Sequence, residues 1–165
     1  MKRCAVAILL LALGACSAPP RHDSPARLPG NFVDQQQPAH GPGQEFALRA
    51  LGFIDAPYRW GGTSPETGFD CSGLVRYIYE QMTGRPLPYN AYGLARFGHT
   101  IEDTQLQPGD LVFFNTLNEP FSHVGIYLGE ARFLHAPNSN SRVRISDMNN
   151  RYWVSRYNGA RRLPI

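Results

Sequence analysis

The sequence feature that most constrains the fold is a strict alternation over residues 122–128. The even-numbered positions from Val124 to Leu128 are aliphatic, and the odd-numbered positions from His123 to Tyr127 are not. Residues 129–131 supply a turn, and residues 132–136 return as a second strand. The segment therefore predicts an antiparallel hairpin with one aliphatic face.

The hairpin brings two histidines to the same end, because His123 opens its first strand and His135 closes its second. If the loop is odd in length, as 129–131 is, Gly125 opposes His135. The imidazoles then share a face as diagonal neighbours, roughly 7–8 Å apart at the backbone. An even loop would place them on opposite faces. Gly125 leaves room for another element, and we expect the helix that follows Cys71 to pack there.

Helical patterns precede the strands. Residues 45–53 carry apolar side chains at helical spacing, and Leu74, Ile78 and Met82 lie four apart after Cys71. Helices first and then a meander of strands predict an α+β fold with an antiparallel sheet. A further helix is expected at 91–97, and further strands at 111–114, 142–146 and 152–157.

Cys71 stands at the start of the second helix, on the buried face of Leu74 and Val75. Asp70 before it is a good N-cap residue. The positive end of a helix stabilises a thiolate and could hold an oxyanion, so cysteines at this position have lowered pKa values. The alternative is a small buried residue that only packs.

A thiol, an imidazole that takes its proton and a polar group that orients the imidazole make a nucleophilic triad. Cys71, His123 and His135 can fill these roles in that order. The same three side chains are also good zinc ligands. A zinc site would lack an obvious fourth ligand and any closely spaced ligand pair, so the residues favour nucleophilic catalysis.

The N-terminal residues have the organisation of a signal peptide, with Lys2 and Arg3, an apolar run over 5–13, and small residues before Cys16. The apolar run is too short to cross a bilayer as a mature helix. Residues 13–16, LGAC, resemble a bacterial lipobox, in which the cysteine becomes the lipid-bearing first residue of the mature protein. An ordinary signal peptide with an incidental Cys16 is the alternative.

The chain is therefore divided into a lipoprotein signal peptide over 1–15, a lipidated Cys16 with a flexible Pro- and Gly-rich tether over 16–43, and a folded domain over 44–165. A net charge of +3 is mild, and no basic block interleaves with aromatic residues. These properties argue against nucleic-acid binding.

The three cysteines of the chain are then accounted for. Cys4 leaves with the signal peptide and Cys16 is acylated. Cys71 stands alone in an extracytoplasmic, oxidising compartment, where it has no disulfide partner. A lone thiol in such a compartment is either buried and inert or kept for its reactivity.

Five ordered motifs within residues 44–163 resemble those of the NlpC/p60 family of cysteine peptidases, which act on the peptide part of bacterial peptidoglycan. Two C-terminal stretches, 148–153 and 156–162, add a similarity to the murein endopeptidase lipoproteins of that family. The five motifs are PYRWGG at 57–62, DCSG at 70–73, PGDLVFF at 108–114, HVGIY at 123–127 and FLHA at 133–136.

The resemblance implies a papain-like α+β core, in which the nucleophile helix packs on an antiparallel sheet of about five strands. By motif match, Cys71 is the nucleophile, His123 is the general base and His135 orients His123. No metal and no cofactor are implied.

The resemblance also implies roles around the nucleophile. Tyr58 matches a tyrosine whose hydroxyl joins a backbone N–H in the oxyanion hole, and Asp70 and Ser72 match positions that line the substrate cleft. One departure is visible at Tyr89 and Asn90, where relatives often carry Arg and then Ser or Thr. If that arginine grips a substrate carboxylate, its loss leaves the bond specificity open.

The function expected from the resemblance is hydrolysis of peptidoglycan stem peptides or cross-links. The D-Ala–diaminopimelate bond is the first choice and the D-glutamyl–diaminopimelate bond the second. A non-catalytic wall-binding lipoprotein would need a degenerate triad, which is not seen. We expect a monomer in the bacterial periplasm, bound to a membrane through lipid on Cys16, and Ser17 after it suggests the outer membrane.

Overall fold

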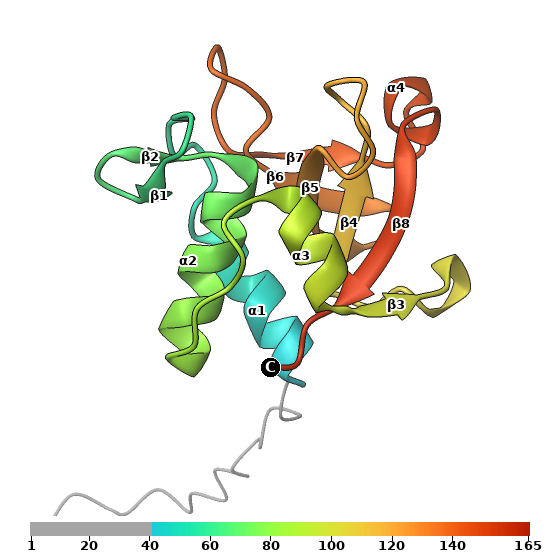
Figure 1. The fold of residues 1–165 in the computed structure, drawn as a ribbon, viewed down its shortest axis with the longest axis horizontal. Coiled ribbons are helices and arrows are strands. Elements are labelled where there is room, and N and C mark those ends of the chain that lie inside the picture. Colours follow the sequence, from blue (N-terminus) through green and yellow to red (C-terminus); the bar gives the residue numbers. More distant parts are fainter. Residues whose placement is uncertain (1–40) are drawn as a thin grey trace, which may run out of the picture. The chain divides into compact units, whose positions relative to one another are not determined.

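The computed structural model describes residues 41–165, which Figure 1 shows as a ribbon. The signal peptide predicted over 1–15, the lipidation at Cys16 and the tether up to residue 40 lie outside the described residues. No helix within 41–165 is long and apolar enough to cross a membrane. Residues 42 and 43, which the sequence assigned to the tether, form the first turn of a helix. Three helices lie between residues 42 and 97: α1 (Pro42–Leu51), α2 (Cys71–Thr83) and α3 (Ala91–Phe97).

The later strands form one antiparallel sheet of six strands in the order β3-β8-β4-β5-β6-β7. This confirms the predicted α+β fold. The sheet is wider than the expected five strands because a short edge strand, β3, pairs with β8. The strands are β3 (His99–Ile101), β4 (Leu111–Phe114), β5 (His123–Gly129), β6 (Arg132–His135), β7 (Arg144–Asp147) and β8 (Tyr157–Arg162). Smaller elements are the hairpin β1 (Thr63–Ser64) and β2 (Gly68–Phe69), and the 3-10 turn η1 (Asp103–Gln105).

The strand predicted over 152–157 is wrong in most of its length. A short helix, α4 (Arg151–Val154), occupies these residues, and β8 begins only at Tyr157. The Asn150 side chain caps this helix by accepting a hydrogen bond from the Tyr152 N–H at 2.9 Å. Four residues are too few to show helical periodicity, and the aromatic and β-branched side chains there are typical of strands.

The sheet separates two hydrophobic cores. The core on one face joins the helices to Val124, Ile126 and Leu134 of the central strands, and the helices α1 to α3 cover that face (Figure 1). The core on the other face gathers Phe114 and Phe133. The second core is closed by α4, and its buried members are Val112, Phe114, Phe133, Trp153 and Ala160.

The gap at Gly125 does not receive the helix that follows Cys71, contrary to the prediction. A Cβ at Gly125 would lie 2.4 Å from the ring of Phe133 and 3.0 Å from the Leu134 carbonyl oxygen. The gap is therefore filled by an aromatic ring of the neighbouring strand on the face opposite the helices. Helix α2 packs on the aliphatic face of β5, because that face offers apolar surface to bury.

An ion pair with a buried carboxylate ties the C-terminal strand to the turn before β4. The Asp110 carboxylate, almost fully buried, accepts hydrogen bonds from Nε and Nη2 of Arg162 at 2.7 and 2.8 Å. Oδ2 of the same carboxylate also accepts the Gln107 N–H at 2.8 Å. The two-pronged geometry satisfies the buried charge and fixes β8 beside β4.

Candidate active site

Asp70 holds the start of α2, as its predicted role of N-cap requires. Its Oδ1 accepts the Gly73 N–H at 2.7 Å, and its Oδ2 accepts the Gly61 N–H at 2.9 Å. A Cβ on Gly73 would lie 1.9 Å from the Gly62 carbonyl oxygen, so only glycine lets the first turn of α2 sit directly against this loop. These contacts fix Cys71, the first residue of α2.

The pairing of β5 with β6 follows the register that brings Gly125 opposite His135, as predicted. The register is reached in a different way from the one expected. The turn contains two residues, 130 and 131, both with positive φ, and Leu128 forms a bulge in β5. The bulged residue restores the odd count that places both imidazoles on one face.

The two histidines are joined to each other and to a serine by hydrogen bonds. His123 Nε2 lies 2.8 Å from His135 Nδ1, and His135 Nε2 lies 2.9 Å from the Oγ of Ser146 in β7. Both imidazoles are buried. His123, His135 and Ser146 therefore form a continuous polar chain that runs away from the cleft.

This chain restricts the tautomers with which His123 can act as a base. Its Nε2 is engaged with His135, so its Nδ1 is the atom left to take a proton. For that, Nε2–H of His123 must donate to Nδ1 of His135, and Nε2–H of His135 must then donate to the Ser146 hydroxyl. The Ser146 oxygen can accept this hydrogen bond, so the chain is compatible with the tautomers that a base at His123 requires.

Trp153 seals the histidine pair from solvent. Its indole stacks on His123 with ring centroids 5.7 Å apart, and it meets His135 edge to face at 5.0 Å. Burial lowers the pKa of His123 to about 4. The pKa of His135 is also lowered, by burial first and then by the charges of His123 and Arg144. Both imidazoles are thus neutral at rest.

The Cys71 thiol meets the start of β5 from the side of α2. It is half-buried, and the Val124 N–H points at its sulfur. Burial raises the pKa of the thiol to about 11, and the charge of Asp70 adds to the rise. The N–H groups at the helix start act in the opposite direction but do not prevail, so the prediction of a lowered pKa is wrong. The resting site holds a neutral thiol beside a neutral imidazole.

Cys71 and His123 open into one cleft of about 520 Å³. Tyr58, Asp70 and Ser72 line the same cleft, so all of these predicted site residues are brought together except His135, which stands behind His123. The pKa of the Tyr58 hydroxyl is raised, mainly by burial and then by the charges of Cys71 and Asp70. Tyr58 therefore stays protonated and can donate a hydrogen bond.

The residues that depart from the family pattern have clear structural positions. Asn90 caps α3 by accepting a hydrogen bond from the Gly93 N–H at 2.8 Å. Ser or Thr at this position could also cap the helix. Tyr89 is 82% exposed at the cleft. The buried Ser72 hydroxyl lies within hydrogen-bond distance of Asp70 Oδ1 and of the Tyr89 carbonyl, so it joins α2 to this segment.

The zinc alternative finds no support in the geometry. Within residues 41–165 no group of three His, Cys, Asp or Glu side chains is arranged to hold a metal ion. His123 and His135 direct ring nitrogens at each other across 2.8 Å, which leaves no room for a cation between those atoms.

Sequence reasoning missed two residues of the site, Ser146 and Trp153. Ser146 follows a strand pattern and nothing local marks it as a partner of His135. Trp153 was assigned to a strand, although Asn150 three residues earlier is a good N-cap and was the one available signal for α4. Both act through contacts between elements that are distant in sequence.

Comparison with known proteins gives a consistent picture. The model of the NlpC/P60 family matches residues 55–162. The murein DD-endopeptidase MepH of Escherichia coli is 42% identical over 113 residues, 67% of this chain and 42% of the relative. The gamma-DL-glutamyl hydrolase of Bacillus subtilis is 42% identical over 111 residues, which cover 67% of this chain and 27% of that protein.

A further relative is the murein DD-endopeptidase MepS/murein LD-carboxypeptidase of Escherichia coli, 43% identical over 64% of this chain and 55% of its own length. The chain thus spans about half or less of the length of these relatives. Among solved structures, an NlpC/P60 family protein from Bacillus cereus has a TM-score of 0.68 at 32% identity, over 74% of this chain and 40% of that one. The NlpC/p60 domain of the peptidoglycan hydrolase SagA has a TM-score of 0.64 at 32% identity, over 74% of this chain and all of that domain.

The buried neutral histidines predict a loss of stability in acid. The folded pKa of His123, about 4, lies below the value of about 6.5 for an unfolded histidine, so the unfolded state binds more protons between these limits. The free energy of unfolding should fall by up to about 3 kcal/mol as the pH drops from 6.5 to 4. Urea midpoints at pH 7, 5.5 and 4.5 measure it.

The variant His123→Gln should flatten this pH dependence. The matched control is His99→Gln, which replaces an exposed histidine in β3 and should keep the wild-type slope. Equal slopes for wild type and His123→Gln would contradict the assignment.

Proposed function

The chain belongs to the NlpC/P60 family, and we propose that it is a cysteine peptidase that hydrolyses an amide bond in the peptide part of bacterial peptidoglycan. One observation carries the proposal. The Cys71 thiol and His123 open into one cleft, and His135 is hydrogen-bonded to His123 from behind, although the three residues come from three different elements. The family supplies the substrate class, since its relatives MepH and MepS are named murein endopeptidases.

The proposed reaction begins with transfer of the Cys71 proton to Nδ1 of His123. The thiolate attacks the amide carbonyl, and the Tyr58 hydroxyl with backbone N–H groups at the start of α2 stabilises the oxyanion. His123 returns the proton to the leaving amine as the C–N bond breaks, which leaves a thioester on Cys71. Water, deprotonated by His123, then hydrolyses the thioester and restores the thiol.

The resting protonation states support general-base catalysis over a preformed ion pair. With the thiol pKa near 11 and the His123 pKa near 4, the thiolate and imidazolium are both disfavoured before substrate binds. In the tautomer that catalysis requires, Nδ1 of His135 accepts the Nε2–H of His123, so His135 would stabilise the imidazolium that forms during attack. Asp70 and Ser72 line the cleft. Their side chains also make hydrogen bonds that hold the start of α2 in place.

The D-Ala–diaminopimelate cross-link is the proposed bond, supported by similarity to two proteins named murein DD-endopeptidases. The D-glutamyl–diaminopimelate bond is the second candidate, supported by similarity to a gamma-DL-glutamyl hydrolase. In both cases the substrate that binds in the cleft is a peptidoglycan stem peptide.

We further propose that lipid on Cys16 anchors the protein at the outer membrane, facing the periplasm, and that the tether presents the domain to the wall. The lipobox-like residues 13–16 support this proposal.

Replacing the nucleophile should abolish hydrolysis. Cys71→Ala removes the atom that forms the thioester, so activity should fall by several orders of magnitude, about 10⁴-fold or more. Digestion of purified cross-linked and linear muropeptides, read by mass spectrometry, measures this and identifies the bond. Full activity in Cys71→Ala, or no product from any muropeptide with the wild type, would overturn the proposed function.

Ser146 is expected to act as a positioning residue. Ser146→Ala removes the acceptor of His135 Nε2–H, so kcat should fall by about tenfold while KM changes little. Nitrogen chemical shifts of the imidazoles should show a mixture of tautomers in this variant. Ser146→Thr, which keeps the hydroxyl, should restore one tautomer and most of the rate. An unchanged tautomer in Ser146→Ala would exclude the role.

The lipid anchor is tested by labelling cells with a fatty acid. The wild type should take up label and sediment with outer membranes, whereas Cys16→Ser should do neither. Cys4→Ser is the matched control, because that cysteine precedes the expected cleavage site, and it should behave as the wild type. Labelling of Cys16→Ser would refute lipidation at this residue.

A further inference from the structure

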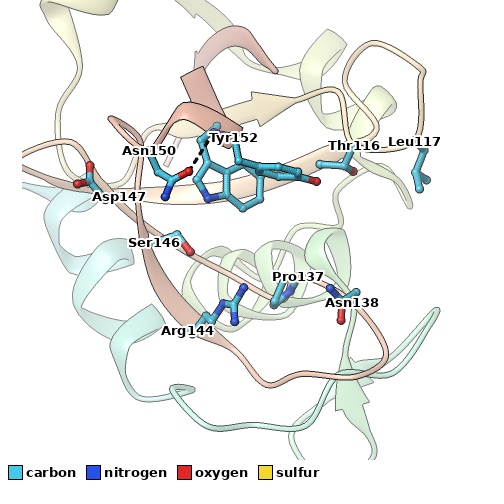
Figure 2. A pocket seen from close by; sticks show the side chains of 10 residues that line it. Thr116, Leu117, Pro137, Asn138, Arg144, Ser146, Asp147, Asn150 and Tyr152 are labelled. Atoms are coloured by element: carbon cyan, nitrogen blue, oxygen red, sulfur yellow. Dashed lines mark hydrogen bonds between the residues drawn. The ribbon is translucent and has the colours of Figure 1, made fainter. Parts of the chain in front are cut away.

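A second pocket, of about 610 Å³, adjoins the catalytic cleft. Figure 2 shows its lining, with Arg144 and Ser146 of β7 on one wall and Tyr152 on the other. Its volume lies within the range of about 300–1,000 Å³ that is usual for ligand pockets. The two cavities share four lining residues from the loops that follow β4 and β6, namely Thr116, Leu117, Pro137 and Asn138.

The catalytic cleft contains no positive side chain that could hold a substrate carboxylate. Within residues 41–165, its lining includes no lysine or arginine, and its one charged carboxylate is Asp70. Arg76 lies near the rim, but its guanidinium already stacks on the Tyr89 ring at 4.3 Å and its Nε donates to the Leu87 carbonyl. A cation for the substrate must therefore come from beyond the cleft.

Arg144 in the second pocket supplies such a cation. It is exposed, and within residues 41–165 no carboxylate oxygen lies within 4.0 Å of it and no hydrogen-bond acceptor is paired with its guanidinium. In the β6–β7 register Arg144 lies directly opposite His135, so the two side chains leave the same face of the sheet. The free guanidinium thus stands beside the catalytic pair.

The proposed substrate carries a matching group. In both candidate bonds diaminopimelate supplies the leaving amine, and it keeps a carboxylate that takes no part in the peptide chain. The planar guanidinium of arginine binds carboxylates through two parallel hydrogen bonds. Resting on the proposed function, we infer that the second pocket is a subsite in which Arg144 binds the free carboxylate of the leaving-side diaminopimelate residue.

A second charged side chain in the pocket further limits the ligands that fit it. Asp147 lines the same cavity and lies away from Arg144 (Figure 2). One positive and one negative side chain suit a single carboxylate or an amino-acid end, and together they offer a polyanion no net positive charge. The pocket therefore fits a stem peptide better than an anionic polymer.

The test uses one muropeptide in two forms, with the diaminopimelate carboxylate free or amidated. The wild type should cleave the free form with a kcat/KM about tenfold higher or more, since charge-assisted hydrogen bonds are strong. Arg144→Gln should lose that factor on the free form and change little on the amidated form. The matched control is Arg132→Gln, whose exposed ion pair with Glu130 lies at the turn between β5 and β6, and it should keep the wild-type preference.

Two outcomes overturn the subsite: a free-to-amidated preference that survives Arg144→Gln, or no preference in the wild type. Failure of the proposed function looks different, because then neither form is cleaved. In that case calorimetric titration of both muropeptides into wild type and Arg144→Gln decides the subsite by itself. Tighter binding of the free form that depends on Arg144 supports it, and equal or absent binding refutes it.

Discussion

The structure of the site depends on the hydrogen bond between Nε2 of His123 and Nδ1 of His135. A contact of 2.8 Å between two buried neutral rings needs each ring in one tautomer and both on one face of the sheet. The face is set by the bulge at Leu128, and the Ser146 hydroxyl can accept from His135 in the tautomer that catalysis requires. A change at either place would alter this bond, which makes the hairpin part of the site.

Desolvation outweighs the helix terminus in setting the charge state of the site. The N–H groups at the start of α2 favour a thiolate on Cys71, yet burial and Asp70 raise its pKa to about 11. Trp153 buries His123 in the same way and lowers its pKa to about 4. Both shifts favour the uncharged pair, so the proton must move during the reaction. Charge then develops only where the oxyanion donors and His135 can stabilise it.

The sequence predicts those parts of the structure that depend on local patterns. Alternation in β5 predicted the hairpin and its face, and a polar residue before an apolar run predicted Asp70 as the N-cap. It could not predict the raised pKa of Cys71, because that value depends on which elements cover the thiol. It also missed α4 and with it Trp153, because a single helical turn has no period to detect. Gly125 was marked as a gap, but only packing shows that Phe133 fills it.

The edge strand β7 shows how much of the chemistry rests on pairing register. Its register is held at both ends, by the Val143 N–H on the Ala56 carbonyl at 2.9 Å and by the Met148 N–H on the Ala131 carbonyl at 2.7 Å. A slip of one residue would turn every side chain of the strand to the other face. His135 would lose its hydroxyl acceptor, and the cation beside it would be replaced by neighbours of opposite or no charge. The backbone contacts that anchor an exposed edge strand therefore decide which hydroxyl and which charge lie beside the buried histidines.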